Sequence, residues 1–207
     1  MSKVFISMGV SADGFIAGPD GGPANPMGGA APFIHDWVFD MHAFRSRLGM
    51  EGGLTEGEDN AIVENVFTRA GAYILGKRMF DEGEVSWPAD APFRAPVYVL
   101  THEKRDPWER PGGTMFHFTN ESLRDVLAKA KKAAGGKDVR ISGGANTVRQ
   151  YLNAGLVDEL IIHQSPSIIG SGLRLLDGLD RDAFSLEIDR VVSSPRVTHM
   201  FYKVNNQ

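Results

Sequence analysis

The stretch Val139-Arg140-Ile141-Ser142-Gly143-Gly144-Ala145-Asn146-Thr147 predicts a β-strand that ends in two glycines, after which a helix begins. Such a turn lets the backbone approach a ligand closely, and it directs free N–H groups and the helix dipole at an anion such as a diphosphate. A Gly-Gly pair is also common in turns that bind nothing. The stretch therefore predicts a strand–turn–helix unit, with either a phosphate-binding or a purely structural role.

Strand-like and amphipathic helical segments alternate on both sides of this unit. Residues 184–192 and 197–204 are two long strand-like runs separated by Ser193-Ser194-Pro195, which predicts a terminal antiparallel hairpin. The pattern predicts an α/β fold with three layers, in which helices cover both faces of a mostly parallel central sheet that ends in this hairpin. Other strands are expected at 3–10, 72–75, 96–100, 114–118, 139–142 and 160–165, and helices over 33–44, 62–70, 120–134 and 144–153.

The segment 18–32 is so rich in Gly and Pro that it predicts a long loop. Long loops in compact domains are often functional, although an insertion that hangs in solvent has the same composition. Thr55 and Glu58 have the spacing of a capping box at the start of the helix over 62–70. No repeat or linker divides the chain, so residues 1–207 are expected to form a single domain.

Composition excludes several classes of function. The chain has 22 Lys and Arg against 26 Asp and Glu, a net charge of -4, so it lacks the basic excess of a nucleic-acid-binding protein. It has no cysteine, which excludes disulfides, thiolate catalysis and Cys-ligated zinc. No apolar run approaches the roughly 20 residues that cross a bilayer. We expect a cytoplasmic protein that binds a small molecule, without membrane or nucleic-acid partners.

Two more predicted strands end next to cations. Gly76 is followed by Lys77 and Arg78 at the start of a helix, where positive charge is unfavourable unless an anion neutralises it. Thr101 and His102 follow a third strand. Since parallel strands bring their carboxyl ends to one edge, the three ends together predict a ligand with two or three separated phosphates. A solvent-exposed basic pair is the structural alternative.

Acid–base chemistry has three candidate carboxylates, Asp13, Asp36 and Asp40, of which the last two are one helical turn apart beside Trp37. A carboxyl group beside aromatic rings can have a raised pKa and donate a proton, whereas an exposed helix face is the alternative. His163 lies inside a strand, where a hydrogen-bonded core histidine is the more common role. His35 and His42 lack metal-ligand spacing, so no metal is expected.

The order of these motifs resembles the dihydrofolate-reductase-like superfamily, and most of all the reductase domain of the riboflavin-biosynthesis deaminase-reductases and its stand-alone bacterial relatives. The likeness extends over roughly residues 3 to 204. It is carried by the first strand with Asp13-Gly14-Phe15-Ile16-Ala17, by Ile74-Leu75-Gly76-Lys77-Arg78-Met79-Phe80, by Val99-Leu100-Thr101, by Ile141-Ser142-Gly143-Gly144-Ala145, and by Asp158-Glu159-Leu160 with Pro166 and Gly170.

The resemblance implies an NADPH-dependent reductase that transfers a hydride to a small heterocyclic substrate, similar to a pterin, a flavin precursor or an imine. It also implies a homodimer, and a loop at 18–32 that closes over the nicotinamide. Asp36 is the residue expected to face the substrate as proton donor, and Asp40 is the second choice. Asp13, Trp37 and His163 are expected to contact the substrate. The expected cofactor contacts are Ile16 and Ala17 at the nicotinamide, Gly76, Lys77 and Arg78 at the phosphates, Leu100, Thr101 and His102 at the 2′-phosphate, and Ser142, Gly143, Gly144, Ala145, Asn146 and Thr147 at the diphosphate.

Two features depart from the family pattern. Met79 stands where the family often has Thr or Ser, so one hydroxyl contact to phosphate is missing. The segments 18–32 and 45–58 are expanded beside the substrate position, so the substrate does not follow from the resemblance. A non-catalytic nucleotide-binding module and a flavin carrier are the alternative functions.

Overall fold

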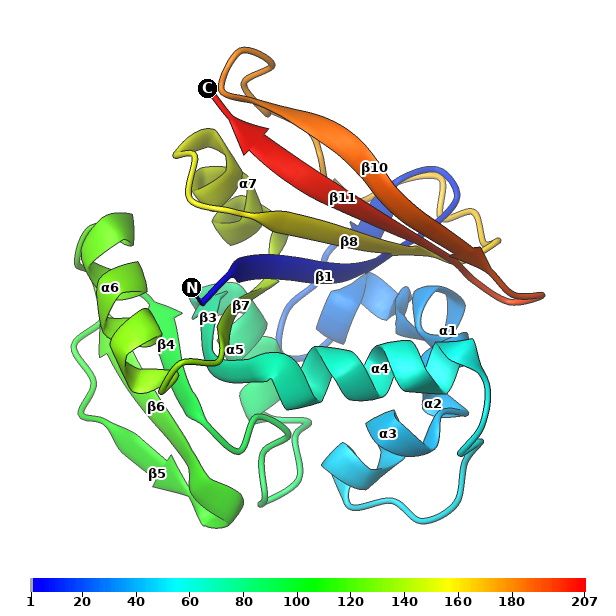
Figure 1. The fold of residues 1–207 in the computed structure, drawn as a ribbon. Coiled ribbons are helices and arrows are strands. Elements are labelled where there is room, and N and C mark those ends of the chain that lie inside the picture. Colours follow the sequence, from blue (N-terminus) through cyan, green and yellow to red (C-terminus); the bar gives the residue numbers. More distant parts are fainter. Residues whose placement is uncertain (1) are drawn as a thin grey trace.

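Nine strands form one mixed sheet in the computed structural model, which describes residues 2–207 (Figure 1). Its strands lie in the order β10-β11-β8-β1-β7-β3-β4-β6-β5, and the six from β8 to β6 are parallel. The hairpin β10–β11 joins β8 in the antiparallel sense, as predicted. The bounds are β1 (Val4–Val10), β3 (Ala70–Gly76), β4 (Pro96–Leu100), β5 (Trp108–Arg110), β6 (Thr114–Thr119), β7 (Asp138–Gly143), β8 (Glu159–Gln164), β10 (Phe184–Ser193) and β11 (Thr198–Asn206), while β2 (Phe15–Ala17) pairs with β9 (Leu173–Arg174).

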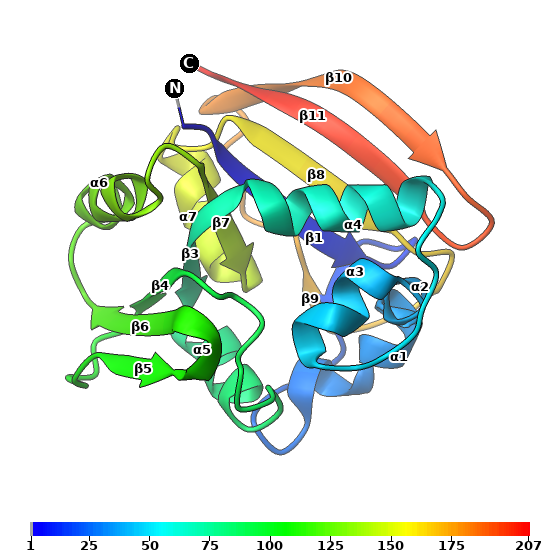
Figure 2. The same cartoon turned by 60° about the horizontal axis from the view of Figure 1, so that its bottom comes forward.

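Helices cover both faces of the sheet, which confirms the predicted three-layer α/β fold (Figure 2). One core lies under α6 (Leu123–Ala133) and α7 (Ala145–Asn153), and the other under α4 (Glu58–Arg69) and α5 (Lys77–Glu84). Successive residues of a strand pack into different cores, because their side chains point to opposite faces of the sheet. On β3, for example, Ile74 belongs to the first core, whereas Tyr73 and Leu75 belong to the second.

The predicted continuous helix over 33–44 is wrong. The structure has three four-residue helices there, α1 (Ala31–Ile34), α2 (Asp36–Phe39) and α3 (His42–Arg45). The chain becomes extended at Met41, which forms a β-bridge with Leu54. The helical spacing of the apolar residues was compatible with either arrangement, and this long-range bridge interrupts the helix.

The start of α4 also differs from the prediction. Gly57, in the left-handed region with φ of 96°, precedes the first helical residue, and no side chain caps it. The Thr55/Glu58 capping box is therefore absent. By contrast, α6 begins after Ser122, whose hydroxyl accepts a hydrogen bond from the Asp125 N–H group. Short 3₁₀ helices complete the structure at η1 (Pro26–Gly29), η2 (Ser46–Leu48) and η3 (Pro111–Gly113).

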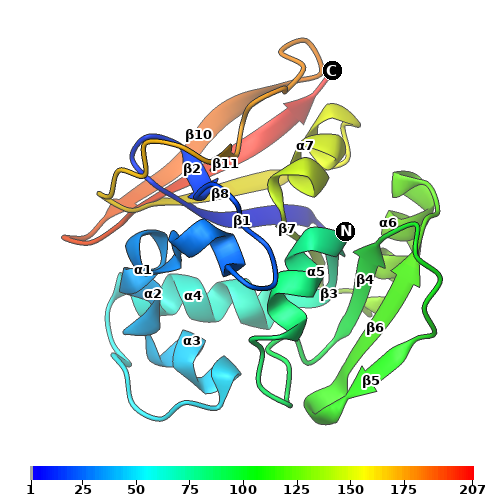
Figure 3. The same ribbon diagram turned by 180° about the vertical axis from the view of Figure 1, so that it is seen from behind.

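The segment 18–32 is a loop over most of its length, and it passes beside α5 (Figure 3). The Met27 N–H group donates to the Glu82 carboxylate at 2.8 Å, and Gly18 donates to the Met27 carbonyl. A side chain at Gly18 would meet the Gly28 carbonyl oxygen at 2.4 Å, so this close approach requires glycine. The loop is thus attached to the body of the protein rather than extended into solvent.

The sheet divides between its two central strands. β1 pairs with β7 only from Val4 to Ile6, whereas it pairs with β8 as far as Val10. Beyond Ile6 on β1 and Ile141 on β7 the two strands separate, and the space between them opens at the carboxyl ends of the parallel strands. This is the edge at which open α/β sheets bind their ligands.

The amino ends of the same strands are held together by ion pairs. Arg69 contacts Asp138 at 2.7 Å and Glu159 at 2.8 Å, and its guanidinium lies 4.1 Å from the centre of the Phe5 ring. Lys3 also binds Glu159. Because the side chains of Arg69, Asp138 and Glu159 are about one fifth exposed, these pairs are screened less than surface pairs.

We predict that Arg69→Met lowers the free energy of unfolding by about 1–3 kcal/mol, because it leaves two partly buried carboxylates without their shared partner. Urea unfolding followed by circular dichroism measures this. Lys129→Met is the matched control, since Lys129 forms an exposed pair with Glu121 and should cost less than about 0.5 kcal/mol. Equal effects of the two variants would contradict the prediction.

Candidate functional site

A cavity of about 1220 Å³ occupies the opening between β1 and β7. Ser7, Met8 and Gly9 line it from β1, and Arg140 and Ser142 from β7. It continues to α2, α4, α5 and the start of α7. Single ligand sites usually measure about 300–1,000 Å³, so this cavity has room for two ligands side by side.

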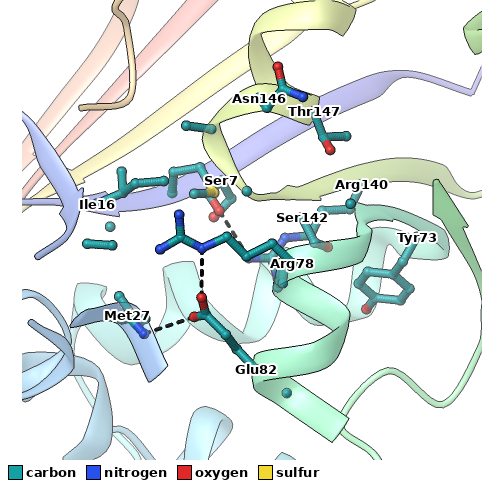
Figure 4. A pocket seen from close by; sticks show the side chains of 18 of the residues that line it. Ser7, Ile16, Met27, Tyr73, Arg78, Glu82, Arg140, Ser142, Asn146 and Thr147 are labelled. Atoms are coloured by element: carbon teal, nitrogen blue, oxygen red, sulfur yellow. Dashed lines mark hydrogen bonds and ion pairs between the residues drawn. The ribbon is translucent and has the colours of Figure 1, made fainter. Parts of the chain in front are cut away.

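One end of the cavity lies at the first turn of α7, where Figure 4 shows Asn146 and Thr147. The N–H groups of a first helical turn have no partner within the helix, and they attract anions. Gly144 caps the helix without any side-chain hydrogen bond. Gly76 allows α7 to approach β3, because a Cβ atom at this position would lie 2.5 Å from the Thr147 hydroxyl oxygen. The predicted phosphate contacts therefore surround one exposed helix end.

The cations at the start of α5 are already neutralised by the protein. Lys77 binds Asp81 at 2.6 Å and Glu103 at 3.3 Å, and Arg78 binds Glu82 at 2.9 Å. Asp81 and Glu82 lie one helical turn further along, and Glu103 follows β4, so the charge of the two cations does not by itself require a bound anion. Lys77 and Arg78 still line the cavity, where a phosphate could compete with these carboxylates. Figure 4 shows Arg78 beside Glu82.

The other predicted cofactor contacts lie on the cavity wall as well. Ile16 and Ala17 are buried and border it from β2, beside the loop residue Met27. Leu100, Thr101 and His102 border it at the end of β4. The Thr101 hydroxyl accepts a hydrogen bond from the Glu103 N–H group, which orders this turn. Segments distant in sequence thus meet along one continuous surface.

Asp36 and Asp40 do not line this cavity, contrary to the prediction. Both bind the guanidinium group of Arg196, and their side chains are 72% and 54% exposed. The helix ends before Met41, and Arg196 lies in the turn between β10 and β11. This arrangement places both carboxylates at the surface, beside Arg196. This exposed position beside Arg196, away from the cavity wall, offers no reason to assign either group as the proton donor.

Asp13 is also displaced from its expected role as a substrate contact. Its carboxylate accepts hydrogen bonds from the Ser11 hydroxyl and from the N–H groups of Ile169 and Gly170. These bonds lower its pKa to about 2. Asp13 therefore ties the turn after β1 to the segment after β8, and it does not line the large cavity.

Trp37 and His163 lie on the cavity wall as expected. The His163 ring connects to a hydrogen-bonded chain that the sequence analysis did not anticipate. Its Nε2 atom lies 2.8 Å from the Ser7 hydroxyl, and its Nδ1 atom 2.6 Å from Nδ1 of His199. Nε2 of His199 lies 3.0 Å from the Asp59 carboxylate. Trp37 covers both imidazole rings, at 5.5 Å and 5.0 Å between ring centres.

Several buried polar atoms on the cavity wall have no hydrogen-bond partner among residues 2–207. They are the indole nitrogen of Trp37, the hydroxyls of Tyr73 and Ser142, and Nε of Arg140. A buried polar group without a partner costs about 1–3 kcal/mol, so folded proteins rarely retain one. Trp37 and Arg140 can only donate, and the two hydroxyls can do so. The wall therefore fits a ligand rich in acceptor oxygens or nitrogens.

Arg140 is the principal charge on this wall. Its guanidinium group donates to the Ser7 carbonyl at 3.0 Å (Figure 4). Burial lowers the pKa of this group, and the nearby Tyr73 has a smaller, opposite effect on it. Within residues 2–207, no Asp or Glu carboxylate makes an ion pair with it. Arginine remains protonated even when buried, so the cavity holds an uncompensated positive charge that an anionic ligand group would balance.

Four important residues of the wall were missed from sequence, namely Ser7, Tyr73, Arg140 and His35. Ser7, Tyr73 and Arg140 are polar residues in otherwise apolar strands, and this pattern was the available signal. His35 packs over β1, where a Cβ atom on Gly9 would lie 2.7 Å from its Nε2 atom. Only the folded chain shows that these four face one space.

Residues 2–207 contain no group of three or more His, Cys, Asp or Glu side chains placed to hold a metal ion. Among the helices of the same residues, none has the length and apolar character needed to cross a bilayer.

The fold is that of a three-layer α/β protein with a large cavity at the carboxyl edge of its parallel strands. Residues 2–199 match the family model of the RibD C-terminal domain, and the chain belongs to this family. A sequence relative is Uncharacterized protein YwjB of Bacillus subtilis (strain 168), which is 26% identical over 180 residues, or 87% of this chain and 86% of its own length.

Two solved structures illustrate the fold. The putative riboflavin biosynthesis protein from Shewanella sp. PV-4 superimposes with a TM-score of 0.68 at 19% identity, with 99% of both chains covered. Dihydrofolate reductase from Enterococcus faecalis, complexed with NADP(H) and RAB-propyl, gives a TM-score of 0.55 at 12% identity, covering 99% of this chain and 96% of that one. The predicted dihydrofolate-reductase-like architecture is therefore confirmed.

We predict that this protein becomes less stable as the pH falls from 6.5 to 5. Burial lowers the pKa of His35 to about 4, and it also lowers the pKa values of His163 and His199. The unfolded chain, with histidine pKa values near 6.5, binds more protons in this range, so protonation favours unfolding. Each such histidine contributes up to about 1.4 kcal/mol per pH unit.

Urea unfolding at several pH values between 5 and 6.5 measures this effect. The lowered pKa of Asp13 and that of Glu159 act below this range, so the carboxylates interfere little. His35→Gln should make the dependence shallower by about one proton. An unchanged slope in this variant would show that His35 titrates alike in both states.

Proposed function

We propose that this protein is an NADPH-dependent reductase that transfers a hydride to a small heterocyclic substrate. The observation that carries this proposal is the single cavity that joins the free first turn of α7 to the polar, aromatic wall formed by β1, β7, β8 and α2. One end suits phosphates and the other suits a planar, polar ring. The membership in the RibD C-terminal family and the NADP(H) in the Enterococcus faecalis structure support the same function.

The residues present fit a phosphorylated dinucleotide. The N–H groups of Ala145, Asn146 and Thr147 would hold its diphosphate, while Thr101, His102 and Lys77 would lie toward the 2′-phosphate. Ile16 and Ala17 would border its nicotinamide ring. When bound, the cofactor supplies the hydride. The protein contributes position, orientation and a dry environment, which account for much of the rate enhancement in such reactions.

Water is excluded by the apolar surroundings of the reacting region. Trp37 and Ile16 are buried there, and Met27 covers the cavity from the loop at 18–32. The bond between Met27 and Glu82 holds this loop over α5 (Figure 4). A loop of this kind can admit and release ligands between reaction cycles.

We infer that the substrate carries an anionic or strongly accepting group. Arg140 and Tyr73 would receive it at the end of the cavity under α4, where Phe67 lies 5.9 Å from the Arg140 guanidinium. A carboxylate or phosphate would compensate the buried charge, and a ring carbonyl could accept from Trp37 or Ser142. Heterocycles similar to pterins or flavin precursors carry such groups.

The homodimer expected from the resemblance stays a prediction. The edge strand β10 exposes three large apolar side chains, Leu186, Ile188 and Val191, which would suit pairing through this edge.

Titration with NADPH and NADH tests the cofactor assignment, with Trp37 fluorescence as the signal. We expect micromolar NADPH binding, about tenfold or more tighter than NADH, because charge-assisted contacts favour the 2′-phosphate. Thr147→Val removes a hydroxyl from the phosphate end without changing the size of the side chain, and it should weaken NADPH binding about tenfold.

Thr68→Val is the control, because this exposed threonine on α4 undergoes the same chemical change and does not line the cavity. Binding of neither nucleotide, confirmed by calorimetry, would contradict the reductase assignment. NADPH binding without oxidation in a screen of pterins, flavins and imines would favour a non-catalytic module instead. A yellow purified protein would indicate a flavin carrier.

A pair of related ligands tests the role of Arg140. With NADP⁺ present, pterin-6-carboxylate should bind about tenfold more tightly than unsubstituted pterin. Arg140→Met should abolish this difference and leave NADPH affinity unchanged, whereas the exposed control Arg181→Met should retain it. Calorimetry measures all four combinations. Equal affinities in the wild-type protein would show that Arg140 does not select an anion.

A further inference from the structure

Four polar side chains connect the cavity wall to the protein surface without interruption. The chain runs from Ser7 through His163 and His199 to Asp59, over distances of 2.8, 2.6 and 3.0 Å. Ser7 and His163 line the cavity, whereas the Asp59 side chain is 19% exposed and does not line it. His199 lies between them and is completely buried. These residues come from β1, β8, β11 and α4, so only the folded chain assembles them.

The hydrogen bonds of this chain have one consistent direction at neutral pH. An ionised Asp59 can only accept, so Nε2 of His199 donates to it. Nδ1 of the neutral His199 ring must then accept from Nδ1–H of His163. Nε2 of His163 in turn accepts from the Ser7 hydroxyl. Burial lowers the pKa of both histidines, and both rings are therefore neutral in this arrangement.

We propose that Ser7, His163, His199 and Asp59 form a proton relay that carries one proton from the surface to the substrate in the cavity. This proposal rests on the proposed reductase function. Hydride transfer moves two electrons and one hydrogen nucleus to one atom of a substrate double bond, and NADPH becomes NADP⁺. The other atom of that bond then needs a proton, and neither Asp36 nor Asp40 lies on the cavity wall to supply it.

The relay balances when it is loaded from the surface. In the loaded state Asp59 is protonated and donates to Nε2 of His199, Nδ1–H of His199 donates to His163, and Nε2–H of His163 donates to Ser7. The Ser7 hydroxyl donates to the substrate. Each group then passes its proton one step toward the cavity. The substrate gains one proton, Asp59 loses one, and the neutral arrangement described above is restored.

The surroundings of the relay disfavour a positive charge on its two imidazole rings. Arg140 and His35 are the titratable groups near its cavity end, and Arg140 disfavours a positive charge on His163. Glu58 and Arg190 lie near its surface end. A positive charge on either buried imidazole is thus disfavoured, so the relay moves its proton between neutral rings. Trp37 packs against both imidazole rings and keeps water from the middle of the relay.

Nitrogen NMR spectra of the ¹⁵N-histidine-labelled full-length protein test the relay without a substrate. At pH 7, His163 should carry its proton on Nδ1 and His199 on Nε2. On acidification, His163 should change to the Nε2–H form while it remains neutral. In His199→Gln this change should disappear, because a glutamine side chain cannot exchange its donor and acceptor atoms by moving one proton.

His117→Gln is the matched control, since His117 is a partly buried histidine on β6 that does not line the cavity, and it should leave the change in His163 intact. The opposite tautomers at pH 7, or an unchanged His163 tautomer until the ring becomes charged, would overturn the relay. With a substrate in hand, His199→Gln should lower kcat about 10²-fold and alter its pH profile, while the NADPH dissociation constant stays the same.

These outcomes separate the relay from the function on which it rests. Absence of NADPH binding in the wild-type protein would refute the reductase function. The NMR measurement of the histidine tautomers would then still decide whether the hydrogen-bonded chain can move a proton. Normal NADPH binding and turnover, together with an unchanged kcat in His199→Gln, would refute the relay alone.

Discussion

The separation of β1 from β7 is the constraint on which the site depends. The two strands pair through Ile6 and Ile141, and beyond this point their backbones part while the flanking strands keep their partners. A parallel sheet that stayed closed here would fill the space with a ladder of hydrogen bonds. Because it opens, backbone and side chains of both strands face a common cavity, and the first turn of α7 is directed at the same space.

The buried polar side chains of the cavity wall destabilise the protein when no ligand is bound. Buried donors without partners and a buried guanidinium group without a carboxylate each lower the stability of the fold. A core built for stability alone would hold apolar side chains at Tyr73 and Arg140. The retention of polar groups there, together with histidines whose pKa values are lowered by burial, is typical of a site arranged around a ligand.

Much of the fold followed from local patterns. The alternation of apolar strands with amphipathic helices predicted the three layers, and the hairpin of β10 and β11 was evident from its length and the turn at Ser193-Ser194-Pro195. The boundaries were less accurate where tertiary contacts override propensity. Met41 pairs with Leu54 and interrupts a segment whose spacing suits one helix, and Gly57 replaces the expected capping box at the start of α4.

The α/β class, the glycine turn before α7 and the strand ends at Gly76, Leu100 and Ser142 that line the cavity could be predicted from the sequence, because they depend on residues close together in the chain. Which polar groups of distant segments line the cavity depends on the packing of the whole chain. Asp36 and Asp40 were plausible from spacing, yet the packing of three short helices directs them to Arg196 at the surface. Asp59, His199, His163 and Ser7 are distant in sequence, and they meet because neighbouring strands and α4 bring them into hydrogen-bonding range.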